Sequence, residues 1–159
     1  MNIESKRLRK ALKKIGWKND RIATNVINEY RSALGPIFSE VAEKFVSEFG
    51  GLEIPGRLWI YPDQAKCGIA DHAKICSIIR ENCCPIASSS YLGDGAIIWI
   101  DDMTRFYASD SEGILFIASD VIQFLKVIVL ETKRCSPPVY LEERLRKAWE
   151  WNNISEPKN

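Results

Sequence analysis

His72 and Cys76 come nearest to a catalytic pair in residue type and spacing. His72 is the only histidine of the 159 residues, and on a helix Cys76 would share its face four positions later. A thiol beside an imidazole is an arrangement that activates a cysteine nucleophile. The same face carries Ile75 and Ile79, however, and no nucleophile elbow or glycine-rich oxyanion loop accompanies the pair. We predict a packed histidine and thiol; a cavity around both would favour the alternative, a cysteine-dependent enzyme.

Asp94, Asp101 and Asp102 offer a second set of reactive groups, because paired carboxylates bind metals or act as acid and base. Their spacing fits no calcium loop, and adjacent aspartates are typical turn residues. The stretch 93–95 (Gly-Asp-Gly) lacks the lysine of a phosphate-binding loop. The sequence therefore predicts no enzyme, no catalytic residue, no metal and no cofactor.

The cysteine pattern indicates reduced thiols. The five cysteines are an odd number without Cys-x-x-Cys spacing, which predicts neither a disulfide framework nor a zinc site: Cys67, Cys76, Cys83, Cys84 and Cys135. Residues 1–14 lack the apolar segment of a secretory signal. The most apolar stretch, Val121–Leu130, is shorter than the roughly 20 residues that cross a bilayer. We expect a cytoplasmic protein without membrane contact.

Charge is divided unevenly along the chain, although the formal net charge is only +1. Residues 1–20 carry seven basic and two acidic side chains, whereas residues 36–131 carry seven basic and fourteen acidic ones, a local charge of −7. The near-neutral total excludes a uniformly basic nucleic-acid coat. An acidic body attracts a basic partner, or simply keeps a protein in solution.

Apolar residues at helical spacing predict three helices at the start of the chain. Residues 1–15 form a basic amphipathic helix that ends at Gly16. Asn19–Asp20 offers an N-cap for a second helix, which Gly35–Pro36 ends. The third helix has the clearest apolar stripe, and Gly50–Gly51 ends it through a left-handed residue.

From residue 52 onward, short strands are separated by turns. The predicted strands cover residues 52–54, 58–61, 83–86, 96–100, 105–108 and 114–117. Ser88–Ser90 is predicted to be a loop. Asp71 and Ser119 are predicted to cap helices, and a last helix follows Pro137–Pro138.

This pattern predicts an α+β fold: a single domain with a mostly antiparallel sheet, flanked by N-terminal, middle and C-terminal helices. The basic helix covers residues 1–15 and the main domain residues 16–131. A C-terminal helix, residues 132–151, packs on the same domain, and residues 152–159 form a flexible tail.

Four segments combine aromatic residues, glycines and charges in a definite order. They are Gly16–Trp17 with Arg21, Phe45–Leu52, Ile98–Asp102 with Arg105–Tyr107, and Ile117–Asp120 before a helix. Over residues 16–130 this order resembles the SUKH superfamily, in particular its third subfamily of bacterial immunity proteins. Residues 85–88 depart from the Pro-x-Gly-acidic segment of that family, and Thr104 stands where the family often has glycine. Because threonine disfavours a positive φ, we expect a different turn shape there.

The resemblance implies a non-catalytic SUKH-like antitoxin that binds the cognate toxin of a polymorphic toxin system, as in contact-dependent inhibition. Such toxins are commonly nucleases with basic surfaces, which the acidic body suits. Predicted partner contacts on loops and strand ends are Glu53, Trp59, Tyr61, Asp63, Asp94, Asp101, Asp102, Asp110 and Glu112. Predicted scaffold residues are Gly16, Trp17, Arg21, Phe49, Gly50, Gly51 and Tyr107.

Two alternatives stay open. A regulatory or scaffold module of the same superfamily fits the motifs equally well. A nucleic-acid-binding module using residues 6–14 fits the basic helix, although the acidic remainder opposes it and no direct nucleic-acid contact is expected. The sequence leaves open the oligomeric state, and whether Trp149 and Trp151 pack on the domain.

Overall fold

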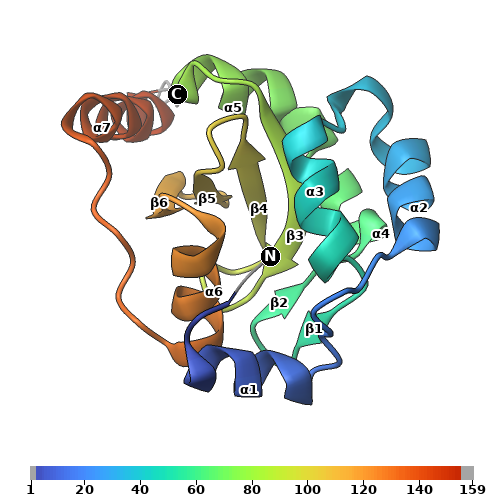
Figure 1. The fold of residues 1–159 in the computed structure, drawn as a ribbon. Helices are drawn as coiled ribbons and strands as arrows, with labels where there is room; N and C mark the ends of the chain where they lie inside the picture. The colour runs from blue at the N-terminus through green and yellow to red at the C-terminus, as the bar shows by residue number, and fades with distance from the viewer. Residues whose placement is uncertain (1–2, 155–159) are drawn as a thin grey trace.

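The computed structural model describes the backbone of residues 3–154 and the side chains of residues 3–147 (Figure 1). Six strands form one sheet in chain order, and every neighbouring pair is antiparallel. The strands are β1 (Glu53–Ile54), β2 (Leu58–Trp59), β3 (Cys83–Ser89), β4 (Ala96–Asp101), β5 (Phe106–Ser109) and β6 (Ile114–Ala118). This antiparallel meander confirms the predicted α+β class.

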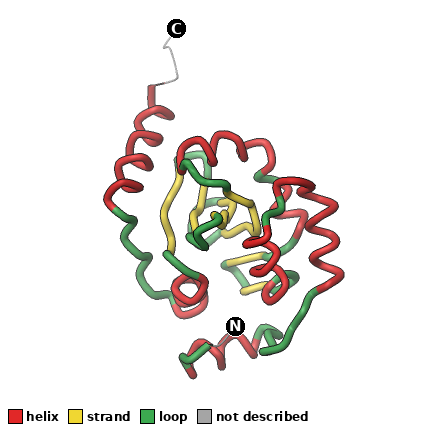
Figure 2. Tube along the Cα trace, turned by 45° about the horizontal axis from the view of Figure 1, so that its top comes forward, coloured by secondary structure: helices red, strands yellow, loops and turns green. Residues whose placement is uncertain are grey.

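Helices surround the sheet (Figure 2). They are α1 (Lys6–Lys14), α2 (Thr24–Leu34), α3 (Glu40–Phe49), α4 (Pro62–Lys66), α5 (His72–Ile79), α6 (Val121–Leu130) and α7 (Val139–Ile154), with 3₁₀ turns at Gly35–Ile37 and Ile69–Asp71. Helices α3 and α6 contact one side of the sheet, and α1 packs against α6. Helices α5 and α7 contact each other and the opposite side.

Alternation along the strands builds two cores, because successive side chains of a strand point to opposite faces. On β4, Ile98 and Ile100 join the larger core, whereas Trp99 joins the smaller one under α5 and α7. The larger core centres on Phe45, whose ring lies 5.5 Å from that of Phe106 (centroid to centroid). The sheet is therefore covered on both faces.

The glycine pair after α3 reverses the chain as predicted. Gly51 has a φ of 74°, the left-handed conformation that glycine tolerates. Gly50 has an ordinary φ of −57° but no room for a side chain. A Cβ at Gly50 would lie 2.6 Å from the Val46 carbonyl oxygen and 2.9 Å from Cγ1 of Val26. Val46 of α3, together with Val26 of α2, thus leaves room only for glycine at this position.

We expect Gly50→Ala to lower the free energy of unfolding by about 1–3 kcal/mol, because an inserted methyl group clashes with Val46 of α3 and Val26 of α2. Chemical denaturation measures the change. The control Gly56→Ala, where a Cβ meets open space, isolates the cost of a positive φ in alanine, about 1 kcal/mol. Unchanged stability of Gly50→Ala would contradict the close packing.

Three local predictions need correction. Helix α2 begins at Thr24 rather than after Asn19–Asp20, and the Ala23 amide before it donates to the Ser47 carbonyl of α3. Asp120, not Ser119, caps α6, because its carboxylate accepts the Gln123 amide at 2.9 Å. Asp71 occupies the position before α5 but makes no side-chain cap bond.

The predicted loop Ser88–Ser90 is wrong for its first two residues, since β3 continues to Ser89. Both serines are buried, and their hydroxyl groups find hydrogen-bond partners. Ser88 donates to the Gln64 side chain at 2.7 Å, and Ser89 donates to the Arg57 carbonyl at 2.6 Å. Polar residues continue this strand because neighbouring elements accept their hydrogen bonds. Helix α4, which supplies Gln64, was not predicted.

In the β4–β5 turn, Thr104 adopts the left-handed conformation that threonine disfavours. Thr104 has a φ of 61°, so the expected change of turn shape is wrong. The Asp101 carboxylate accepts the amides of Met103 and Arg105, each at 2.9 Å, on either side of Thr104. These two hydrogen bonds hold the turn against a strain of about 1–2 kcal/mol.

The last helix lies against the domain. Leu141 of α7 is buried in the smaller core, and Arg144 donates to the Ile79 carbonyl at 3.0 Å. The predicted tail begins too early, because α7 continues to Ile154. Residues 155–159 and the side chains of Trp149 and Trp151 lie outside the described residues.

Candidate functional site

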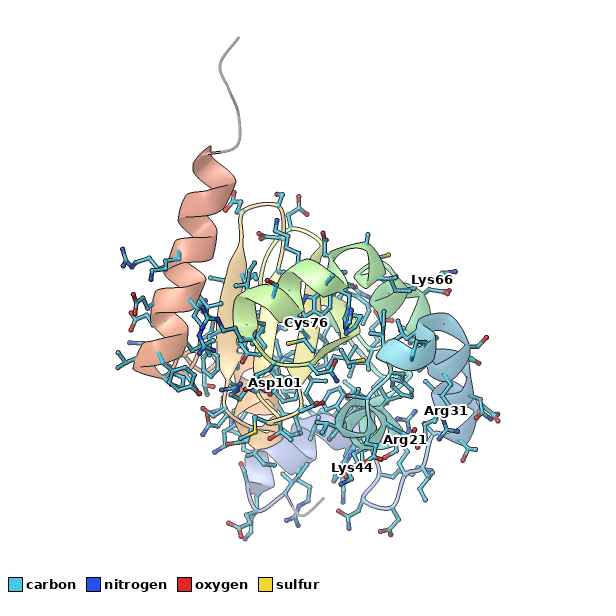
Figure 3. All side chains as sticks on the ribbon, turned by 90° about the horizontal axis from the view of Figure 1, so that it is seen from above. Arg21, Arg31, Lys44, Lys66, Cys76 and Asp101 are labelled. Carbon is cyan, nitrogen blue, oxygen red and sulfur yellow. The ribbon has the colours of Figure 1, made fainter. Side chains whose placement is uncertain are left out.

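The sheet separates the predicted acidic contacts into groups. Asp94 lies in the β3–β4 loop, and Asp110 and Glu112 lie in the β5–β6 loop at the same end of the sheet. Asp101 and Asp102 lie at the opposite end of β4, where the chain turns into β5 (Figure 3). A third group surrounds β1, β2 and α4. The nine residues therefore do not form one surface.

The end with Asp94 and Asp110 encloses a cavity of about 510 Å³. Asp71, just before α5, also lines it, so three aspartates line one space. Lys74 of α5 lines the same cavity, and Glu112 is exposed in the adjoining loop. We name Asp71, Asp94, Asp110 and Glu112 the acidic end.

Asp110 is held by its own turn. Its Oδ1 accepts the amides of Glu112 at 2.8 Å and Gly113 at 3.1 Å. A Cβ at Gly93 would lie 2.4 Å from Asp110 Oδ2, so glycine lets the two loops approach closely. The fold thus places the loops of two separate hairpins side by side.

The third group lies along the sheet edge. Glu53 of β1 pairs in register with Trp59 of β2. Glu53 and Asp63 are exposed, Tyr61 is 36% exposed and Trp59 is half-buried. An aromatic pair with exposed carboxylates is a surface suited to partner contact, but its position differs from that of the acidic end.

The structure corrects the expectation for Asp101, which is completely buried. Its Oδ2 accepts the Arg105 Nε at 2.6 Å and the Tyr107 hydroxyl at 2.8 Å. Arg105 also donates to the Tyr140 hydroxyl of α7 at 2.7 Å. A buried carboxylate with these partners is a structural ion pair and cannot meet a partner protein. Asp102 beside it is exposed and accepts the Asn82 side chain at 3.3 Å.

The ion pair alters the titration of its members. Burial lowers the pKa of Arg105, but the hydrogen bond to Asp101 and the charge of that residue outweigh it, so the net direction is upward. Burial raises the pKa of Tyr107, and the nearby Asp101 carboxylate raises it further. Both effects keep the cluster in its paired form at neutral pH.

The predicted scaffold residues are mostly core. Trp17 and Phe49 are buried and their rings stack, with centroids 6.4 Å apart. Gly16 has a φ of 94° where α1 ends. Arg21 donates to the Glu48 carbonyl at 3.1 Å, and burial lowers its pKa.

His72 and Cys76 do approach each other, with Cys76 Sγ 3.4 Å from His72 Nε2. Cys76 Sγ also accepts the Cys83 amide at 3.3 Å, so the thiol is used in packing α5 on β3 (Figure 3). Neither His72 nor Cys76 lines the cavity at the acidic end, although that cavity borders the same helix. The described residues include no group of three or more His, Cys, Asp or Glu side chains that could hold a metal ion.

Helix α1 presents its cations to solvent. Leu8 and Leu12 are buried, and the lysines of the helix lie on its exposed surface. Arg9 donates to the Ile3 carbonyl, which ties the chain before the helix to it. Across the part of the chain that the structure describes, no helix is long and apolar enough to cross a membrane.

Sequence reasoning missed Asp71 as a member of the acidic end and Lys74 as a residue that lines its cavity. The sequence indicated only a helix cap at Asp71, and no local pattern places the start of α5 beside the two hairpin loops. Glu81, 3.7 Å from Arg105, was also missed. Its position depends on the turn between α5 and β3, which no local pattern predicts.

Comparison with known proteins gives one family. The model of the SUKH-3 immunity protein family matches residues 4–131, which include α1 and the whole sheet. No curated protein and no solved structure matched the chain. The matched span contains all four segments on which the resemblance was based, and the chain belongs to the SUKH-3 immunity protein family.

Proposed function

We propose that this protein is a non-catalytic, cytoplasmic antitoxin that neutralises a cognate toxin nuclease by binding its basic surface. The observation that carries the proposal is the acidic end, where Asp71, Asp94 and Asp110 line one cavity. Membership of an immunity protein family supports a toxin as the partner. A nuclease needs cations to hold phosphate groups, and carboxylates on a rigid sheet end complement such a surface.

Charge explains how the partner is captured. Opposite charges increase the rate at which two proteins meet, and salt weakens this attraction. The acidic end is formed by two hairpin loops and the start of α5, and the Asp110 turn keeps one carboxylate in place. A partner therefore meets preplaced charges, which lowers the entropy cost of binding.

The packing of the reactive side chains supports inhibition by covering the toxin's surface, without a catalytic step. Cys76 is occupied by His72 and the Cys83 amide rather than opening into the acidic cavity. The Asp101 carboxylate, which is fully buried, is held in an ion pair with Arg105. Inhibition then requires only that the antitoxin covers the surface through which the toxin acts.

Neutralising the acidic end tests this function. We expect the triple variant Asp94→Asn, Asp110→Asn and Glu112→Gln to associate about 10–100-fold more slowly with the toxin encoded beside this gene. Asparagine retains the oxygen that accepts the turn amides, so the fold is kept. Stopped-flow association at two salt concentrations, with survival in co-expression, measures the effect.

A matched control changes the same charge elsewhere: Asp20→Asn, Glu29→Gln and Glu40→Gln, all exposed and outside the acidic end. We expect this control to associate and protect like the unmodified chain. Equal association rates for both triple variants would contradict capture by the acidic end. Turnover of a substrate by the purified chain would contradict the non-catalytic role.

The exposed lysines of α1 favour a second candidate, a nucleic-acid-binding module. That function would give binding of DNA or RNA by the protein alone, weakening steeply with salt. The acidic charge of residues 36–131 opposes it. A regulatory or scaffold role in the same superfamily would instead show no protection against the neighbouring toxin.

A further inference from the structure

The outer edge of β6 is open for most of its length. β6 ends the strand order, so no further strand pairs with it. Among the residues that the structure describes, one backbone hydrogen bond reaches this edge, from the Cys135 amide to the Ile117 carbonyl at 3.0 Å. The edge of Ile114–Phe116 therefore presents backbone groups that another extended chain can pair with.

Residues 131–138, which we name the strap, connect α6 to α7 around this edge (Figure 1). Between the strap, β6 and α7 lies a groove of about 950 Å³. Its lining combines apolar residues of β6, α6, α7 and the β3–β4 loop with charged residues of the strap and α7: Leu92, Ile114, Leu115, Phe116, Val127 and Leu145, and Glu131, Lys133, Arg134, Glu142 and Arg146. Leu115, the second residue of the strand, is 38% exposed. An open edge thus lies beside a groove with apolar side chains along the strand and charged ones opposite.

The groove adjoins the cavity of the acidic end at one residue. Ile114, the first residue of β6, lines both the groove and the cavity that contains Asp94 and Asp110. A segment lying along β6 therefore reaches carboxylates where the strand begins. The carboxylates at the start of β6 and the apolar side chains along it suit an extended segment. Such a segment would carry a cationic side chain at one end and apolar side chains along its length.

We propose that an extended segment of the toxin adds to β6 as a seventh strand, with a lysine or arginine in the acidic end. This inference rests on the proposed function. Backbone pairing supplies affinity, and side chains at alternate positions supply specificity. A second copy of this chain fits less well, because it would bring its own strap and α7 to the same edge.

Leu115→Lys tests the edge, because a charged side chain on an edge strand opposes further pairing. We expect this variant to bind the toxin encoded beside the gene at least 10-fold more weakly. The control Ile22→Lys changes a residue that is 74% exposed and remote from β6, and it should bind normally. Thermal unfolding verifies that both variants fold.

Hydrogen exchange of the unmodified chain gives an independent readout. We expect amides of residues 114–117 to exchange at least 10-fold more slowly in the complex, while amides of α2 stay unchanged. Toxin binding without this protection, or unaffected by Leu115→Lys, overturns the inference and leaves the proposed function intact. No binding by the unmodified chain overturns both. Protection of the same amides by self-association alone assigns the edge to a second copy instead.

Discussion

Asp101→Ala is expected to lower the free energy of unfolding by about 3–5 kcal/mol, a large part of the stability of a domain this size. The substitution removes the acceptor of four hydrogen bonds, two from turn amides and two from side chains. Arg105, whose side chain is only 10% exposed, would lose its buried counter-charge. Urea unfolding monitored by tryptophan fluorescence measures the loss.

The neighbouring aspartate provides a matched control. Asp102 is exposed, and Asp102→Ala should change stability by no more than about 0.5 kcal/mol. Tyr107→Phe removes one hydrogen bond of the cluster and should cost about 1 kcal/mol. If Asp101→Ala and Asp102→Ala proved equally stable, the buried ion pair would not be a main support of the β4–β5 turn.

We expect the folded protein to lose stability at alkaline pH, because four of its buried groups are thiols and phenols. Burial raises the pKa of Cys84 to about 12 and raises that of Cys83. Burial also raises the pKa of Tyr30, which donates to the Ile86 carbonyl, and of Tyr107. Each group keeps its proton in the folded chain at a pH where the unfolded chain has lost it.

The stability that these groups contribute is therefore complete below their unfolded pKa values, about 8.5 for thiols and 10 for phenols. It is lost as pH rises toward the folded values, at about 1.4 kcal/mol per pH unit for each group. The two thiols alone should remove roughly 5–6 kcal/mol by pH 10.5. Urea unfolding at pH 7, 8, 9 and 10 measures this decline.

A buried and an exposed cysteine together test whether buried thiols cause the decline in stability with pH. Cys84→Ala removes one buried ionisable group and should make the decline with pH shallower, whereas Cys67→Ala changes an exposed thiol and should leave it unchanged. Equal stability at pH 7.5 and pH 10 would show that the buried thiols and phenols do not resist ionisation.

Periodicity predicted the fold well where burial is one-sided or continuous. The run Ala96–Ile100 became β4, and the stripe that includes Phe45 and Phe49 became α3. Helix α4 escaped prediction because its five residues are too few for a periodic pattern, and its contacts with β3 place it. Helix α2 begins later than predicted because the Ala23 amide before it pairs with Ser47, which belongs to another element.

The candidate site was less predictable because it depends on which loops meet. Asp94 and Asp110 are separated by two strands, and the antiparallel order alone places them at one end. Asp101 was assigned to the surface because adjacent aspartates are usual in turns. Its burial follows from Arg105, Tyr107 and the turn amides, and the nearby arginine and tyrosine were the signal available in the sequence.

The strand order has a further consequence for how the chain reaches its native state during synthesis. Because each strand pairs with its chain neighbour, the sheet can assemble progressively as the ribosome extends the chain, and only the β2–β3 connection, which contains α4 and α5, is long. Helix α1 is the exception, since it packs against α6, which is made more than a hundred residues later. Helix α1 is thus translated before every strand of the sheet but is among the last elements to dock, and its apolar residues Leu8 and Leu12 stay uncovered until α6 has left the exit tunnel.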